Sequence, residues 1–234
     1  MCMHQNVIVV GGGSGIGRAV CEMLHGVGAT LTVVGRDPEK LATVTSPIGG
    51  LPIVGDATRF ADMVTACEQA TEKFGPLTGV VNCAGSLLLK PAHLTGEEEY
   101  AATIAANLTT AFAVCHAAGK IMTGGGSVVL VSTAAARTGI ANHEAIAAAK
   151  AGVEGLMRSA AATYASRGLR FNCVAPGLTR TPLTAKMTAN EASEKASVAM
   201  HALGRLGEPD DVARAICWLL DPANDWVTGQ VLGV

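Results

Sequence analysis

The sequence predicts a single α/β domain in which helices cover both faces of a parallel sheet. The chain has 234 residues, a length suited to one compact domain of this class. Hydrophobic residues make up 49% and charged residues 15% of the sequence, which supplies a sizeable core and excludes global disorder. Short β-branched runs alternate with longer helical segments, and runs this apolar are typical of strands buried on both faces. We see no linker or repeat, so we expect one domain over residues 1–234.

Seven apolar runs are expected to form the strands of this sheet, because right-handed crossovers between them would place helices on both faces. In chain order they are Asn6–Val10, Thr30–Val34, Leu51–Val54, Val80–Asn82, Ser127–Ser132, Arg170–Val174 and Gln230–Val234.

The segments between the strands carry helical patterns with recognisable ends. Gly28 stops the first helix, and Asp37 followed by Pro38 is typical of a helix start. The expected helices are Ser14–Val27, one near Pro38–Val44, Arg59–Phe74, Tyr100–Met122 and His143–Arg167.

Charge, hydropathy and cysteine usage exclude several classes of function. The net charge is −2 and no basic cluster exceeds two residues, so we expect no nucleic-acid partner. No apolar run reaches the roughly 18 residues of a membrane span, and the start of the chain lacks a signal-peptide pattern. The scattered cysteines without a C-x-x-C pair indicate reduced thiols in a cytoplasmic protein. No cluster has metal-ligand spacing, so we expect no metal.

A glycine-rich turn follows the first strand. Val7–Val10 runs into the segment G-G-G-S-G-I-G, and a helical pattern begins directly after it. A strand, a glycine-rich turn and a helix N-terminus together favour binding of a pyrophosphate, although an ordinary tight turn would also use glycines. The residues expected to hold this group are Gly11, Gly13, Ser14, Gly15, Ile16 and Gly17.

The G-x-x-x-G-x-G spacing of this turn resembles the short-chain dehydrogenase/reductase family, and further matches follow in family order over essentially the whole chain. The resemblance implies a Rossmann fold with strand order 3-2-1-4-5-6-7, a nicotinamide cofactor and a small-molecule substrate. The matching residues are Asp56 and Ala57 beside the adenine; Asn82, Ala84 and Gly85 of the N-N-A-G signature; Asn107 and Lys150 of the active site; and Pro176, Gly177 and Thr181 near the nicotinamide. Residues 183–203 match the substrate lid, and His201 lies within this segment.

The residues after the second strand favour NADP(H) over NAD(H). An acid at the first position would bind the ribose hydroxyls and repel a 2′-phosphate, but Gly35 stands there. Arg36 follows, and its planar guanidinium suits a 2′-phosphate. Asp37 could be read instead as the ribose acid, or as the cap of the helix that starts at Pro38.

The family's catalytic pattern is broken at one position. The resemblance implies a Tyr four residues before the Lys as proton donor, and a Ser thirteen residues before that Tyr to bind the substrate oxygen. Counting back from Lys150 gives Ile146 and Thr133. Thr133 keeps a hydroxyl, but Ile146 has no titratable proton, so the usual acid/base position is empty. The only tyrosines, Tyr100 and Tyr164, lie elsewhere and are expected to be structural.

His143 is a candidate substitute for the missing proton donor. It precedes Ile146 by three residues, so the two would share a helix face, and an imidazole titrates near neutrality. The alternative is that Asn142 caps this helix, with His143 and Glu144 in its first turn.

Two functions of different class remain open. The first is an NADP(H)-dependent oxidoreductase acting on a small carbonyl, alcohol or enoyl substrate, with Asn107, Thr133, Lys150 and His143 as catalytic residues. The second is an NADP(H)-binding pseudoenzyme that serves as a sensor or scaffold. The resemblance also implies a homodimer or homotetramer that pairs the long helices Tyr100–Met122 and His143–Arg167.

Overall fold

The computed structural model describes residues 5–234, and Cys2 and His4 lie outside this part of the chain. Seven parallel strands form one sheet in the order β3-β2-β1-β4-β5-β6-β7, which confirms the fold expected from the sequence. The strands are β1 (Asn6–Val10), β2 (Thr30–Gly35), β3 (Leu51–Val54), β4 (Gly79–Asn82), β5 (Gly126–Val131), β6 (Leu169–Ala175) and β7 (Val231–Gly233).

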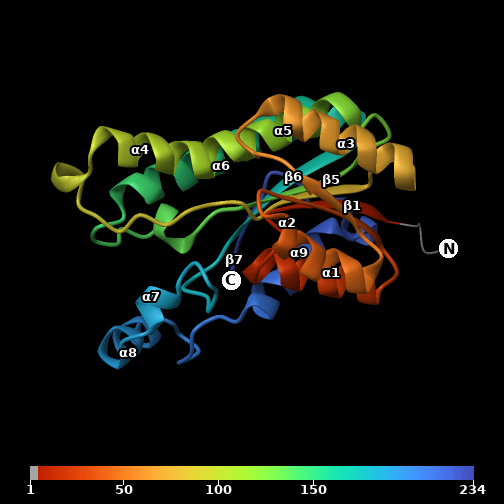
Figure 1. Ribbon diagram of the computed structural model, residues 1–234. Helices are drawn as coiled ribbons and strands as arrows, with labels where there is room; N and C mark the ends of the chain where they lie inside the picture. The colour runs from red at the N-terminus through yellow and green to blue at the C-terminus, as the bar shows by residue number, and fades with distance from the viewer. Residues whose placement is uncertain (1–4) are drawn as a thin grey trace.

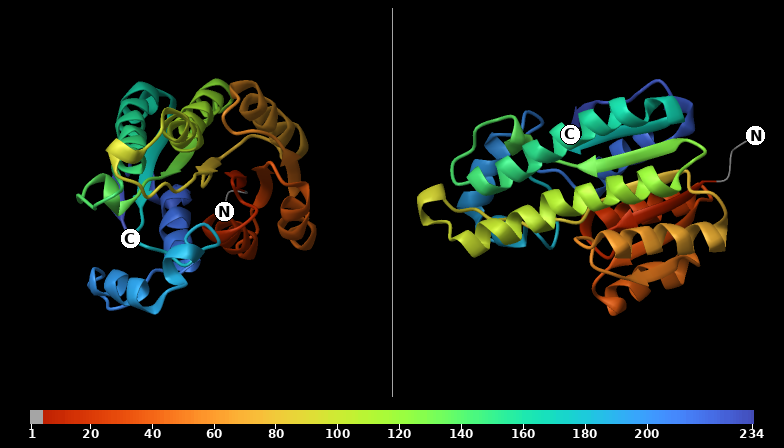
Figure 2. Two further views of the ribbon diagram at one scale, coloured as in Figure 1. Left: turned by 60° about the vertical axis from the view of Figure 1, so that its left-hand side comes forward. Right: turned by 90° about the horizontal axis from the view of Figure 1, so that it is seen from above.

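Helices cover both faces of the sheet (Figures 1 and 2). One layer consists of α1 (Gly15–Gly26), α2 (Pro38–Ile48) and α9 (Pro209–Leu220), and the other of α3 (Phe60–Phe74), α5 (Thr110–Ile121) and α6 (Glu144–Tyr164). Three short helices, α4 (Glu97–Ile104), α7 (Ala185–Thr188) and α8 (Glu191–Ala199), extend the fold. In Figure 1, α7 and α8 lie to one side of the main body, beyond the end of the sheet.

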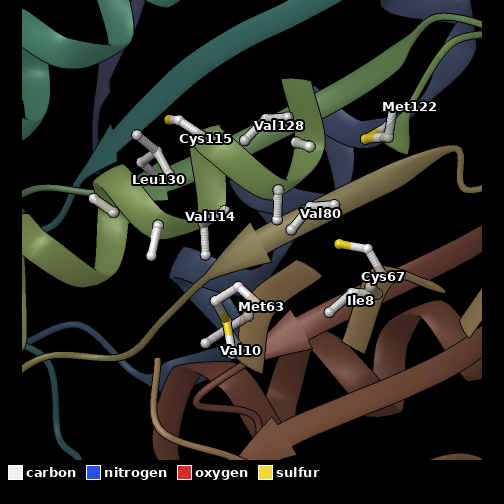
Figure 3. Packing of buried hydrophobic residues seen from close by; sticks show 14 of the residues in the cluster. Ile8, Val10, Met63, Cys67, Val80, Val114, Cys115, Met122, Val128 and Leu130 are labelled. Atoms are coloured by element: carbon white, nitrogen blue, oxygen red, sulfur yellow. The ribbon is translucent and has the colours of Figure 1, made fainter. Parts of the chain in front are cut away.

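Alternation along the central strands divides the core into two layers. Ile8 and Val10 pack under α3 and α5, whereas Val7 and Val9 pack under α1 and α9. Successive side chains of a strand point to opposite faces, so the four apolar residues Val7–Val10 contribute two side chains to each layer of the core. Figure 3 shows part of the first layer, in which Met63 of α3 and Val114 of α5 belong to one cluster with the strand residue Val80.

Most helix ends differ from the sequence prediction by one to four residues, and two of them have a clear physical reason. α2 continues beyond Val44 to Ile48 and ends at Gly49, whose φ of 62° suits a glycine. α6 begins at Glu144 with His143 as its N-cap residue, so the prediction of Asn142 as the cap was wrong. Asn142 instead adopts a φ of 63°, a left-handed conformation that asparagine tolerates better than most residues and that does not fit an N-cap.

The helix Glu97–Ile121 is continuous through α4, a π-helical turn at Ala105–Thr109 and α5. By length and composition alone it could cross a membrane, which the sequence reading had excluded. Half of its most apolar window is buried inside the protein, where its α5 part packs beside α3 and α6. Such burial is the behaviour of a core helix, whose alanine-rich face lies against the sheet.

Candidate active site

The glycine-rich turn lies between β1 and α1, and it leaves no room for a side chain at Gly11 or Gly17. Gly11 and Gly15 have positive φ values of 76° and 50°, which favour glycine. A Cβ atom on Gly17 would lie 2.5 Å from the carbonyl oxygen of Gly11. Ser14 occupies the N-cap position of α1, but its side chain makes no capping bond. The backbone N–H groups of this turn lie at the N-terminus of α1, a position that favours an anion.

The segment after β6 contacts this turn at Gly15. The side chain of Thr181 lies 3.3 Å from a Cβ atom placed on Gly15, and the Thr181 N–H donates to the hydroxyl of Thr184. The carbonyl oxygen of Pro176 accepts a hydrogen bond of 2.9 Å from the Ala134 N–H. The segment that carries Pro176, Gly177 and Thr181 thus joins the first turn of α1 to the loop after β5.

The residues after β2 and β3 lie at the adjacent edge of the sheet. Asp37 caps α2, because its carboxylate accepts from the N–H groups of Glu39 and Lys40. Arg36 is exposed and makes no ion pair within residues 5–234. The carboxylate of Asp56 accepts from the N–H and hydroxyl of Thr58, and these bonds, with a smaller contribution from the charge of Arg36, lower its pKa. Ala57 packs against the core.

The loop after β4 contacts the glycine-rich turn on one side and the side chains of Asn107 and Lys150 on the other. The side chain of Asn82 is buried, accepts from the Ala84 N–H at 3.1 Å and donates to the Thr110 hydroxyl at 3.3 Å. A Cβ atom on Gly11 would lie 2.6 Å from the Ala84 nitrogen, so the loops after β1 and β4 are in contact. A Cβ atom on Gly85 would lie 2.8 Å from Oδ1 of Asn107 and 3.5 Å from Nζ of Lys150.

Asn107 is buried in the π-helical turn, a feature frequently found at functional sites. Its Oδ1 accepts from the Ser86 N–H at 3.3 Å, and its Nδ2 donates to the Ser86 hydroxyl at 3.1 Å and to the Thr103 carbonyl at 2.9 Å. The sequence analysis did not predict Ser86 as a partner of Asn107. Its position directly after Gly85 could have suggested it.

Lys150 and Thr133 face the same region from α6 and from the loop after β5. Lys150 is 8% exposed, and its ammonium donates to the Val131 carbonyl at 2.7 Å. Burial lowers the pKa of Lys150 to about 8, because desolvation disfavours its charged form. The Thr133 Oγ1 accepts from the Ala135 N–H at 3.3 Å, which leaves its own O–H free to donate. Ile146 is 4% exposed and contributes only apolar surface.

The other candidates make no hydrogen bond to these groups within residues 5–234. His143 hydrogen-bonds through Nδ1 to the Ala141 carbonyl at 2.8 Å, and no bond in the described chain joins it to Thr133, Asn107 or Lys150. Tyr164 stacks on Phe171 with ring centroids 5.5 Å apart, and Tyr100 is half-exposed on α4. Neither tyrosine lies near Lys150 in the hydrogen-bond network.

Within residues 5–234, no three His, Cys, Asp or Glu side chains are grouped as metal ligands would be. The charged side chains among the candidate residues with a lysine, arginine or carboxylate group are Lys150, Arg36 and Asp56.

The chain is similar to several known proteins over nearly its whole length. A family model described as enoyl-(acyl carrier protein) reductase matches residues 11–234. Galactitol 2-dehydrogenase (L-tagatose-forming) of Cereibacter sphaeroides is 33% identical over 97% of this chain and 90% of its own. Cyclohexanol dehydrogenase of an Acinetobacter species is 34% identical over 97% of this chain and 92% of its own. The solved structure of a short-chain type dehydrogenase/reductase from Mycobacterium ulcerans has a TM-score of 0.91 at 34% identity, over 99% of this chain and 89% of that one.

The chain belongs to the short-chain dehydrogenase/reductase family, as these matches over nearly its whole length show. It is thus an oxidoreductase-type Rossmann domain of a family that uses nicotinamide cofactors. The reported relatives are all dehydrogenases or reductases by name, and none of them supports the alternative of a sensor without catalysis.

Proposed function

We propose that this protein is an NADP(H)-dependent oxidoreductase acting on a small carbonyl, alcohol or enoyl substrate. The observation that carries the proposal is the proximity of Lys150 and Asn107 at Gly85, in a loop that also contacts the glycine-rich turn. Two relatives are named as dehydrogenases of alcohols, which supports the same class of substrate for this chain.

Three polar side chains of the site, those of Lys150, Thr133 and Asn107, have a role in this reaction. The cofactor, when bound, supplies or accepts a hydride. The Lys150 ammonium would hold the ribose hydroxyls of the cofactor. The Val131 carbonyl engages only one proton of this ammonium, and the others can donate. The free O–H of Thr133 would donate to the substrate oxygen, and Asn107 would hold the adjoining loop at Ser86. Ile146 cannot supply the proton, which therefore comes from His143 or from water.

The preference for NADP(H) rests on Arg36. Gly35 removes the acid that would repel a 2′-phosphate, and Asp37 is engaged in capping α2. Arg36 is exposed at the carboxyl end of β2 and retains a planar fork of donors for a phosphate.

The cofactor proposal is tested with Arg36→Glu. We expect the Kd of NADPH to rise at least about tenfold, because a charge-assisted contact of roughly 1.5–3 kcal/mol is lost, while NADH binding changes little. Lys73→Glu, with the same charge change in the last turn of α3, is the matched control. An equal loss of NADPH and NADH binding would overturn the preference.

The reaction proposal is tested by turnover. The purified chain is incubated with NADPH or NADP⁺ and a panel of carbonyl, alcohol and enoyl substrates, and absorbance at the nicotinamide band is followed. Turnover of at least one class is expected, and cofactor binding without any turnover would overturn the proposal. In an active chain, His143→Ala decides the proton source: a kcat loss within the 10²–10⁴-fold range of general acid catalysis assigns it to His143, and an unchanged kcat assigns it to water.

We further propose that residues 1–234 act as one domain whose segment 183–203 is the substrate lid. This segment holds α7 and α8, and it carries the exposed apolar side chains of Leu183 and Met200, with Leu203 at its end. His201 connects it to the site, since its Nε2 accepts from the Leu178 N–H and its Nδ1 bonds to the Ser197 carbonyl. An apolar substrate would suit such a lid.

A homodimer or homotetramer is the proposed assembly. The outer face of Glu97–Ile121 exposes Tyr100 and Phe112, and α6 exposes small residues such as Gly155, beside which a partner helix could approach closely. We also propose a cytoplasmic location, which is supported by the six free cysteines in the described residues.

A further inference from the structure

A buried carboxylate lies one helical turn beyond Lys150. Glu154 is 4% exposed and belongs to the same face of α6 as Lys150, since the two are four residues apart. Burying an ionised carboxylate is costly unless hydrogen bonds and opposite charges compensate. The proposed chemistry above gives this group no role.

The partners of Glu154 come from both sides of Thr133. The Ser132 hydroxyl donates to Oε1 at 3.0 Å, and the Arg137 Nε donates to Oε2 at 3.3 Å. Ser132 immediately precedes Thr133, and Arg137 directly follows the short 3₁₀ helix Ala134–Ala136 that Thr133 begins. Arg158, on α6 itself, lies 3.6 Å from Oε2.

A second set of contacts joins the same segment to Lys150. The Lys150 ammonium donates to the Val131 carbonyl at 2.7 Å, and the Ser132 Oγ lies 3.4 Å from the main-chain oxygen of Lys150. Segment 131–137 is therefore fastened to α6 at two successive turns. Thr133 stands between the points of attachment.

We propose that Glu154 is a positioning residue, whose buried carboxylate fixes the Thr133 hydroxyl relative to the Lys150 ammonium. This role rests on the function proposed above. Glu154 contacts neither group's reacting atoms. It acts by holding the loop after β5 against α6, and a misplacement of about 1 Å in such a geometry can lower a rate roughly 10²-fold.

The glycine-rich turn belongs to other elements, β1 and α1, and none of its residues contacts Glu154 in the described hydrogen bonds. Loss of Glu154 should therefore lower kcat and leave NADPH binding nearly unchanged. A general loosening of the fold would instead affect both.

The test compares Glu154→Ala, Glu154→Gln and Arg158→Ala in turnover and in NADPH titration. For Glu154→Ala we expect a kcat at least about tenfold lower, with the Kd of NADPH within about twofold of the wild type. Glu154→Gln keeps an oxygen for the Ser132 hydroxyl and should restore part of kcat. Arg158→Ala removes a half-exposed partner that does not reach segment 131–137, and should retain kcat.

Arg137→Ala covers the case in which Glu154→Ala does not fold, because Arg137 is half-exposed and its truncation leaves Glu154 paired with Ser132 and Arg158. It should lower kcat in the same way. If the wild type is active and Glu154→Ala is equally active, the positioning role is overturned and the proposed function stands. If Glu154→Ala is unfolded, an equally active Arg137→Ala has the same meaning. Parallel losses of kcat and NADPH binding would also overturn it. A wild type without turnover overturns the proposed function, and this role falls with it.

Discussion

In the proposed active site, Ile146 stands at the position of the family's proton donor, one helical turn before Lys150. Restoring a phenol there should supply a general acid beside Lys150, so we expect Ile146→Tyr to raise kcat for carbonyl reduction by up to about 10²-fold. Because Ile146 is buried, the larger ring should cost about 1–3 kcal/mol of stability. Ile146→Phe has a similar volume without the hydroxyl, and the phenol has no catalytic effect if both variants turn over at the same rate.

Lys150 makes the stability of the protein depend on pH. Its pKa is about 8 in the fold and 10.5 as an ordinary value, so between these pH values the unfolded chain holds a proton that the folded chain has released. Stability attributable to Lys150 should therefore rise with pH over this window, by up to about 3 kcal/mol.

Denaturant unfolding of the wild type and of Lys150→Met at several pH values from 7 to about 10 measures this difference. Other titrating groups occur in both proteins and cancel in the comparison. Parallel stability curves for the two would contradict a lowered pKa.

At the scale of elements, the turn between β1 and α1 depends on the absence of a side chain at Gly17. In Gly17→Ala, the new Cβ atom would press on the carbonyl of Gly11 at 2.5 Å, so the turn must open. We expect NADPH binding, followed by fluorescence, to weaken at least about tenfold and stability to fall by about 1–3 kcal/mol.

Gly26→Ala is the matched control in the same helix. No atom lies within 4 Å of a Cβ atom at Gly26, and its φ is not positive. An alanine there should leave NADPH binding unchanged and stabilise the helix by up to about 1 kcal/mol. Equal effects of the two substitutions would show that the turn geometry does not govern binding.

At the scale of the whole molecule, the outer faces of Glu97–Ile121 and α6 should pair two copies of the chain. Light scattering at micromolar concentration should report a dimer or tetramer. Phe112→Glu places a charge on this face, where the ring is 49% exposed, and should shift the mass toward the monomer.

Val27→Glu, at an exposed position just after α1, serves as the control for this variant and should leave the mass unchanged. A wild-type monomer would contradict the proposed assembly.

Local patterns in the sequence were sufficient to predict the sheet, the glycine-rich turn and the family. The apolar runs around Val7–Val10 and Ser127–Ser132 mark strands because a parallel strand is buried on both faces. The glycines at 11, 15 and 17 mark the turn because their conformations and contacts exclude other residues. Asn142 is a case that local patterns did not predict. The sequence suggested it as the N-cap of α6, but its backbone is left-handed and His143, the next residue, is the N-cap.

By itself, the sequence determined the apolar runs that form the strands, the glycine-rich turn, and the presence of Ile146 four residues before Lys150. Only the tertiary structure decided which distant groups meet: Ser86 with Asn107, Lys150 with the Val131 carbonyl, and Glu154 with Ser132 and Arg137. The physical reason is that strand and turn signals arise from neighbouring residues along the chain. Hydrogen bonds of buried polar groups depend instead on how α6 packs across the sheet.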